Sequence, residues 1–353
     1  MVDYNSQAEK MNRPYVNLSS ENTIQKMLDA LYKSLDKFIA LDGVVGVTLN
    51  GGLSRGYGDY LSEIDITIFL HEKQFNEYKN GKYPFALFIT VIDGFLYDIK
   101  TVSYEQEIVR EYENVTLWDL SYAKILYDPK DKIADLIKQK LSKTVDISKT
   151  SDLLWSAFGW YKLAGDIWIH RQDGVQGHYV LNNAITPLLS TLFTVNNEYI
   201  PHEKWLVHMS KSLTWKPDDW EARLMGAMST GDFSIISLKE RQSIFEGLWI
   251  DINSKVCELT GFHTELNFTQ KHSYETLIKL LEKSEYTISE WEAVSSLESL
   301  NYEPMHKIFK RVGDKIVLDK NSFLSIKPED MYVWMYEIAN ETRKKFDLHS
   351  SCQ

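Results

Sequence analysis

The chain has 353 residues, 44% hydrophobic and 13% aromatic, with a formal net charge of −11 at pH 7. That length corresponds to about two domains with ample apolar material for their cores. Nucleic-acid-binding proteins normally carry a basic surface, so we expect no nucleic-acid partner.

The remaining composition predicts a cytoplasmic protein without a membrane segment. Cys257 and Cys352 are the two cysteines, and they have no metal-binding spacing. Residues 1–17 lack the apolar core of a signal peptide, and no stretch approaches the roughly 18 apolar residues of a membrane helix.

The first part of the chain predicts a helix followed by four strands. Apolar residues recur at a helical period from about residue 23 to Asp42-Gly43. Strands are expected at 44–49 and 64–70, a short helix at 73–80, and strands at 85–92 and 95–102. Asp93-Gly94 predicts a tight hairpin between the last two. Residues 103–145 indicate a helix, a strand or turn at 123–129, and another helix.

From about residue 150 the pattern becomes helical. Two amphipathic helices, joined at Asp173-Gly174, predict an antiparallel pair, and helical patterns continue to about residue 300. A hairpin around Gly313-Asp314 and a helix over 328–346 follow. We therefore expect an α+β protein with a mixed-sheet domain (1–148), an α-helical bundle domain (149–300) and a C-terminal appendage (301–353).

Residues 50–69, NGGLSRGYGDYLSEIDITIF, contain two overlapping patterns. The first is G-x-S-x-G, from Gly52 to Gly56, in which Ser54 would be the nucleophile of a hydrolase. That chemistry needs the serine on a tight turn between a strand and a helix. Here a turn-rich segment and then the strand at 64–70 follow the serine, so we do not expect a serine hydrolase.

The second pattern predicts a metal site. Glu63 and Asp65 lie two positions apart at the start of a strand, so their carboxylates leave the same face of the sheet. Asp98 lies inside an apolar run, where an unpaired charge is costly, and we expect it on an adjacent strand as a third ligand. Carboxylate oxygens are ligands that Mg²⁺ prefers in proteins.

The same stretch predicts a phosphate-binding turn. Gly51-Gly52 lets backbone N–H groups approach phosphate oxygens closely, and Ser54 can add a hydroxyl donor. Arg55 either contacts phosphate or solvates the loop.

In this order, these residues resemble the signature of the DNA polymerase β-type nucleotidyltransferase superfamily, over about residues 20–130. The signature is a helix, a strand ending in a glycine turn, an acidic pair on the next strand and a third acid on a later strand. Glu63 is a departure, because the family more often has aspartate there. The matching residues are Gly51, Gly52, Ser54, Arg55, Ser62, Glu63, Asp65 and Asp98.

This resemblance implies transfer of a nucleoside monophosphate from a magnesium-bound nucleoside triphosphate, ATP being the expected one, to a hydroxyl of a small molecule. Glu63, Asp65 and Asp98 would hold Mg²⁺ and carry catalysis, with Asp98 as the acceptor-side ligand or base. The glycine turn, Ser62 and Arg55 would bind the nucleotide.

The helical residues resemble, more faintly, the second domain of aminoglycoside and lincosamide nucleotidyltransferases, which implies an antibiotic acceptor. Asp166, Asp173 and Glu203 would then face the acceptor, while Lys162 or Lys204 reaches the nucleotide phosphates. Otherwise these are solvated side chains. Two alternatives stay open: an enzyme that attaches AMP to other proteins, and a non-catalytic nucleotide-binding protein, suggested by Glu63.

Overall fold

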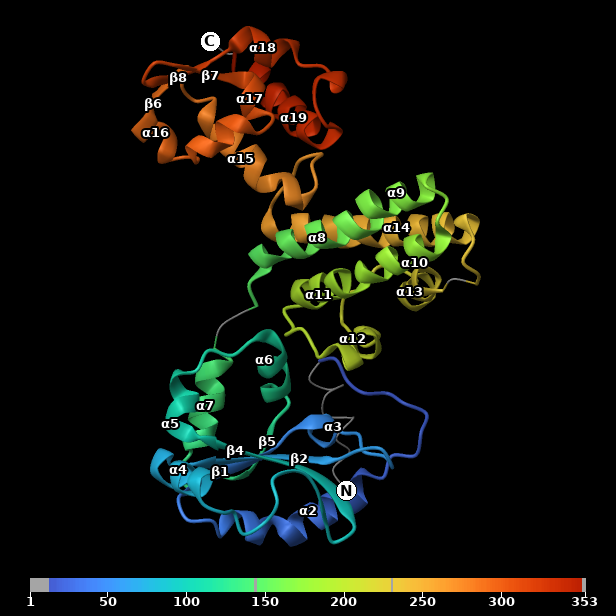
Figure 1. The fold of residues 1–353 in the computed structure, drawn as a ribbon, viewed down its shortest axis with the longest axis vertical. Helices are drawn as coiled ribbons and strands as arrows, with labels where there is room; N and C mark the ends of the chain where they lie inside the picture. Colours follow the sequence, from blue (N-terminus) through green and yellow to red (C-terminus); the bar gives the residue numbers. More distant parts are fainter. Residues whose placement is uncertain (1–12, 143–144, 230, 351–353) are drawn as a thin grey trace.

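A computed structural model describes residues 13–142, 145–229 and 231–350, with side chains to residue 345. The expectations for residues 1–12 and for Cys352 lie outside this range. The molecule is elongated, and three parts follow one another along its long axis (Figure 1): a sheet with flanking helices, a group of helices, and a smaller part with short strands. In the described residues, no helix combines the length and the apolar character needed to cross a bilayer.

The first part is built on a mixed five-stranded sheet in the order β3-β4-β2-β1-β5. β2 and β4 are parallel, and the other neighbouring strands are antiparallel. The predicted hairpin is confirmed, because Asp93 and Gly94 join β3 to β4 with φ values of 49° and 84°. The strands are β1 (Val44–Leu49), β2 (Ile64–Leu70), β3 (Phe88–Ile92), β4 (Phe95–Ser103) and β5 (Lys124–Tyr127).

Helices cover both faces of this sheet (Figure 1). Ile64 and Ile68 of β2 pack in one core cluster with Leu31 of α2, so α2 covers one face. Side chains alternate along a strand, so Asp65 points to the opposite face, where Phe69 packs against α7. The helices of this part are α2 (Ile24–Ile39), α3 (Gly51–Ser54), α4 (Glu72–Asn80), α5 (Tyr104–Val109), α6 (Asn114–Leu120) and α7 (Lys132–Lys140).

The second part contains the predicted antiparallel pair. Its first member runs from Thr150 to His170 with a π-helical segment in the middle, and α10 and α11 pack along it. The second member begins at Gly174, where the Asp173 side chain caps it, and is interrupted at Ala184. The helices are η1 (Ile147–Lys149), α8 (Thr150–Phe158), η2 (Gly159–Ala164), α9 (Gly165–His170), α10 (Gly174–Asn183), α11 (Ile185–Val195), α12 (Glu203–Ser210), α13 (Trp220–Met228) and α14 (Ile235–Thr260).

The third part contains a small sheet that includes the predicted hairpin. The predicted hairpin at Gly313-Asp314 forms β7 and β8, but β8 also pairs with β6, so a three-stranded sheet reaches back to Glu285. The elements are η3 (Phe268–Gln270), α15 (Lys271–Leu280), β6 (Glu285–Thr287), α16 (Ile288–Glu292), η4 (Leu297–Asn301), α17 (Met305–Ile308), β7 (Phe309–Val312), β8 (Lys315–Leu318), α18 (Lys320–Ser325), η5 (Pro328–Asp330) and α19 (Val333–Ser350).

An N-terminal strap, residues 13–17, joins the first part to the second. The Arg13 guanidinium donates to the Ser121 carbonyl at 2.9 Å and to the Glu198 carboxylate at 2.8 Å. Tyr122 donates its hydroxyl to the Pro14 carbonyl at 2.7 Å. These bonds hold the end of α6 against the helical part, and α6 is one wall of the site described next.

Candidate active site

Three carboxylates converge on the face of the sheet opposite α2. Glu63 directly precedes β2, Asp65 lies on β2, and Asp98 is the residue paired with Asp65 on the parallel strand β4. One carboxylate oxygen of each lies within 4.8 Å of the others, and all three residues are half-buried. The predicted convergence is therefore present, and we call these residues the carboxylate trio.

The trio carries more negative charge than its surroundings neutralise. Burial raises the pKa of Asp65 to about 7, and the negative charges of Glu63 and Asp119 add to the shift. Lys100 lies two residues after Asp98 on β4, so its side chain is on the same face of the sheet. Its Nζ lies 2.9 Å from the Asp98 carboxylate. Burial would lower the pKa of Lys100, but the hydrogen bond and charge of Asp98 outweigh burial and raise it.

This donor set fits a hard divalent cation. Three carboxylates supply only oxygen ligands, as Mg²⁺ requires. A cation between them would stabilise the ionised form of Asp65, which burial and the neighbouring negative charges disfavour. Glu63, Asp65 and Asp98 are the residues that would hold it.

A cavity of about 570 Å³ opens above the trio. β2 and β4 form its floor, and α5 and α6 contribute one side. From the helical part, α12 contributes Lys204 and Trp205, and its N-cap residue His202 also lines the cavity. Both parts of the chain therefore build the site. The residues predicted from the sequence that line it are Gly51, Gly52, Arg55, Ser62, Glu63, Asp65, Asp98 and Lys204.

Of the two glycines in the turn, Gly51 is the more constrained. It has a φ of +66°, and a Cβ added there would lie 1.8 Å from Oδ2 of Asp65. A Cβ on Gly52 would meet only the Tyr57 carbonyl oxygen, at 3.2 Å. The first glycine is therefore needed because the Asp65 carboxylate packs directly against the backbone.

Ser54 does not have the phosphate-binding role that the sequence suggested. Gly51–Ser54 form the single turn α3, which rotates Ser54 inward, and its hydroxyl donates to the Gly51 carbonyl at 2.9 Å. Ser54 is 4% exposed and does not line the cavity. It is thus placed neither as a nucleophile nor as a phosphate donor; it stabilises the turn.

Ser62 lines the cavity, and its hydroxyl is used within its own loop. It donates to the Asp59 carboxylate at 3.0 Å and accepts from the Asp59 backbone N–H at 2.9 Å. These bonds order the loop that presents Glu63.

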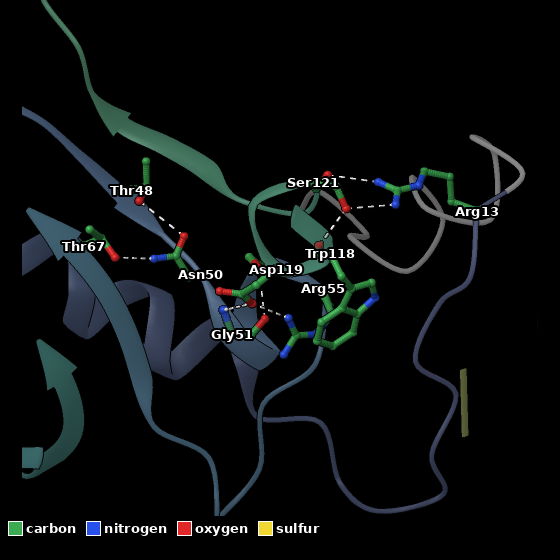
Figure 2. Close-up of polar contacts among 10 residues, drawn as sticks. Arg13, Thr48, Asn50, Gly51, Arg55, Thr67, Trp118, Asp119 and Ser121 are labelled. Atoms are coloured by element: carbon green, nitrogen blue, oxygen red, sulfur yellow. Dashed lines mark hydrogen bonds and ion pairs between the residues drawn. The ribbon is translucent and has the colours of Figure 1, made fainter. Parts of the chain in front are cut away.

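Arg55 neither solvates the loop nor reaches freely into solvent. Its side chain is 4% exposed, and Nη1 donates to the Asp119 carboxylate at 2.8 Å (Figure 2). The guanidinium lies 4.4 Å from the ring centre of Trp118 and 5.6 Å from that of Trp205. We call Arg55, Trp118, Asp119 and Trp205 the arginine wall of the cavity.

Three predicted acceptor residues do not line the cavity, which corrects the sequence-based expectation. Asp166 accepts from Gln242 Nε2 at 2.8 Å inside the helical part. Asp173 caps α10 by accepting from the Gln176 N–H at 3.0 Å. Glu203 is exposed in the first turn of α12. The helical periodicity of the sequence placed these acids on helices, but it could not show which face of each helix lies toward the sheet and the cavity.

Sequence reasoning missed Lys100, Asn50 and Asp119. Lys100 could have been found, since it lies two residues after Asp98 on the same strand and so shares its face. Asn50 bridges two strands, accepting from the Thr48 hydroxyl and donating to the Thr67 hydroxyl (Figure 2). Asp119 has no local signal, because its partners lie far away in the chain.

No family model and no curated protein matches this chain. Among solved structures, it is similar to a nucleotidyltransferase-like protein from Exiguobacterium sibiricum 255-15. The two are 11% identical, the alignment covers 83% of this chain and 98% of that chain, and the TM-score is 0.38. A likeness at this level carries no inference about chemistry or substrate, so function has to follow from the side chains of the cavity.

Proposed function

We propose that this protein transfers a nucleoside monophosphate, AMP from ATP in the first instance, to a hydroxyl group of a small molecule, with Mg²⁺ as cofactor. The observation that carries the proposal is the carboxylate trio on two adjacent strands at the floor of a cavity. A volume of about 570 Å³ is within the range of small-molecule and cofactor sites.

In the proposed reaction, the acceptor oxygen forms a bond to the α-phosphorus. The bond from that phosphorus to the oxygen bridging the α- and β-phosphates breaks, and pyrophosphate leaves. Bound magnesium supplies neutralisation of the phosphate charge. Glu63 and Asp65 would hold the cation at the phosphate end of the nucleotide, and we assign the acceptor hydroxyl's proton to Asp98.

Lys204 is the cation that we assign to the phosphates. It lines the cavity from α12, and no carboxylate of the described residues lies within ion-pair distance of its Nζ. Lys100, by contrast, is already paired with Asp98. Because Lys204 comes from the helical part, nucleotide binding would depend on how that part sits against the sheet.

The walls of the cavity favour an acceptor with an apolar or aromatic portion. Tyr112, Trp118 and Trp205 line it, whereas Asp166 and Asp173 do not. The acids expected on the helical part are thus absent from the lining, but other carboxylates line it: Glu63, Asp65, Asp98, Glu107 and Asp119. The cavity therefore offers aromatic rings to a lincosamide-like compound and carboxylates to an aminoglycoside. Both classes belong in the set of acceptors to be tested.

A second candidate, attachment of AMP to a protein, is favoured by exposed apolar side chains beside the trio. Ile89 pairs with Asp98, and Val91 pairs with Leu96, so these side chains share the trio's face of the sheet. Ile89 is 59% exposed and Val91 66%. Exposed apolar residues on an edge strand are a typical docking surface for another chain.

The test is a mass-shift screen with the full chain, ATP and Mg²⁺, against hydroxyl-bearing compounds and against proteins. Pyrophosphate release that requires Mg²⁺ and a mass gain equal to AMP on one acceptor would support the proposal. Nucleotide binding without pyrophosphate release across the whole set would instead indicate a non-catalytic binder.

A further inference from the structure

The Asp119 carboxylate is bound by the two groups that were expected to bind phosphate. Its Oδ1 accepts from the Gly51 backbone N–H at 3.4 Å and from Arg55 Nη1 at 2.8 Å (Figure 2). Asp119 comes from α6, and its negative charge contributes to the raised pKa of Asp65. One carboxylate oxygen thus lies between the glycine turn and the buried arginine.

These two donors are poorly satisfied by the carboxylate. A 3.4 Å N–H···O contact is longer than an ordinary hydrogen bond. Arg55 uses only Nη1 in the bonds formed with described residues, and its buried Nε has no acceptor there. A guanidinium offers five N–H donors in a fork that matches phosphate geometry, so a phosphate could satisfy it more fully.

Arg55 is also unable to lose its counter-ion without replacement. Its side chain is 4% exposed between two indole rings, and Asp119 is its ion-pair partner. A buried charge without a partner is strongly unfavourable. An anion that displaces Asp119 must therefore bond to Arg55 itself. Asp119 is 40% exposed, so it has room to turn toward solvent.

We propose that the Asp119 carboxylate competes with a phosphate group of the nucleotide for the Gly51 amide and Arg55. This inference rests on the proposed function for the identity of the phosphate donor. Asp119 thereby sets the affinity for nucleotide: a multiply charged phosphate displaces it, whereas singly charged anions do not. When no cation is bound at the trio, competition from Asp119 also weakens binding of the triphosphate.

The test is calorimetric titration of the full chain with inorganic pyrophosphate in magnesium-free buffer. Asp119→Asn removes the competing charge and keeps a side chain of the same shape, so we expect pyrophosphate to bind at least about tenfold more tightly than to the unaltered protein. Asp36→Asn is the matched control. Asp36 is exposed on α2, which covers the opposite face of the sheet, and the net charge changes equally.

Equal or weaker pyrophosphate binding by Asp119→Asn, or a gain of the same size in Asp36→Asn, would overturn the proposal. Adding Arg55→Lys to Asp119→Asn should abolish the gain, because a lysine cannot reproduce the fork. Should Asp119→Asn not fold, Asp119→Ser carries the same test. Failure of both to fold would show that Asp119 cannot leave Arg55, which also overturns the proposal.

Magnesium, acceptor and turnover do not enter this titration. A tighter pyrophosphate complex in Asp119→Asn together with no nucleotidyl transfer to any acceptor would therefore contradict the proposed function and leave the competition by Asp119 standing. Transfer activity together with an unchanged pyrophosphate affinity in Asp119→Asn would support the proposed function and contradict the competition by Asp119.

Discussion

The floor and the arginine wall of the cavity hold their charges in opposite ways. On the floor, the carboxylates of Glu63, Asp65 and Asp98 gather within 4.8 Å, and Lys100 is the one cation among the described residues that pairs with any of them. In the wall, the buried guanidinium of Arg55 has a carboxylate partner and lies against two indole rings. The floor therefore brings negative charges together, whereas in the wall the positive charge of Arg55 is balanced by the Asp119 carboxylate.

This difference separates what the two regions contribute. Burial and the neighbouring negative charges both disfavour the ionised Asp65 carboxylate, as its raised pKa indicates, so the charged floor reduces the stability of the folded chain. The packed wall contributes to stability through buried aromatic surface. Substitutions on the floor should therefore reduce activity and spare the fold, and substitutions in the wall should first destabilise the fold.

The largest effect is expected for Asp65→Asn. Losing one charged ligand from the trio should lower nucleotidyl transfer by about 1,000-fold, the equivalent of several kcal/mol of transition-state stabilisation. The melting temperature of the metal-free protein should stay the same or rise, because repulsion is removed. Activity is measured as Mg²⁺-dependent pyrophosphate release, with Asp36→Asn as the control. Turnover within a few fold of normal would contradict the assignment of the trio.

Trp118→Ala tests the wall. Trp118 is 3% exposed and packs on Arg55, so its truncation should cost about 3–5 kcal/mol of unfolding free energy. Chemical denaturation measures this loss. Trp118→Phe, which keeps an aromatic ring, should lose less than half as much. If Trp118→Ala instead lowered transfer as much as Asp65→Asn did and left stability intact, the proposed division between floor and wall would be wrong.

Gly51→Ala tests the contact between the turn and the floor. The alanine Cβ would clash with the Asp65 carboxylate, and the positive φ of this position would cost about 1–2 kcal/mol more in folding free energy. We expect transfer to fall about 100-fold through displacement of Asp65. Gly52→Ala is the matched control and should have a much smaller effect, because only the Tyr57 carbonyl must shift. Equal losses in both variants would mean that the amides of both glycines contact substrate.

The floor could be predicted from the sequence because its geometry is local. Side chains two apart on a strand share a face, which placed Glu63 beside Asp65, and the apolar run around Asp98 indicated the neighbouring strand. The wall could not be predicted in this way. Asp119 meets Gly51 across 68 positions, and that contact depends on how α6 packs. Ser54 was misjudged because the single turn α3 rotates it into the core.

The pH dependence of stability should distinguish the floor from the rest of the molecule. Folding raises the pKa of Asp65 from 3.8 to about 7, mainly through burial, so the folded state keeps a proton that the unfolded state releases. That contribution is fully present below pH 3.8 and is lost as the pH rises through about 7. The melting temperature of Asp65→Asn, measured in chelator, should therefore exceed that of the unaltered protein by more at about pH 8 than at about pH 5. A difference that is independent of pH would contradict the raised pKa.

The smallest effect on activity is expected at α12, where we predict opposite outcomes for substitutions of two adjacent residues. Lys204 lines the cavity and Glu203 does not, although the sequence suggested a binding role for both. Lys204→Met keeps the length of the side chain and removes its charge, so the KM for ATP should rise about tenfold, with a smaller change in kcat, for one lost contact to phosphate. Glu203→Gln should leave both constants within about twofold, because an exposed charge outside the cavity is screened by salt. The two variants change the net charge by the same amount in opposite directions, so repeating both assays at higher salt separates a direct contact from a field effect. An increase in KM for Lys204→Met that disappears in salt would mean that the helical part only steers the nucleotide toward the floor.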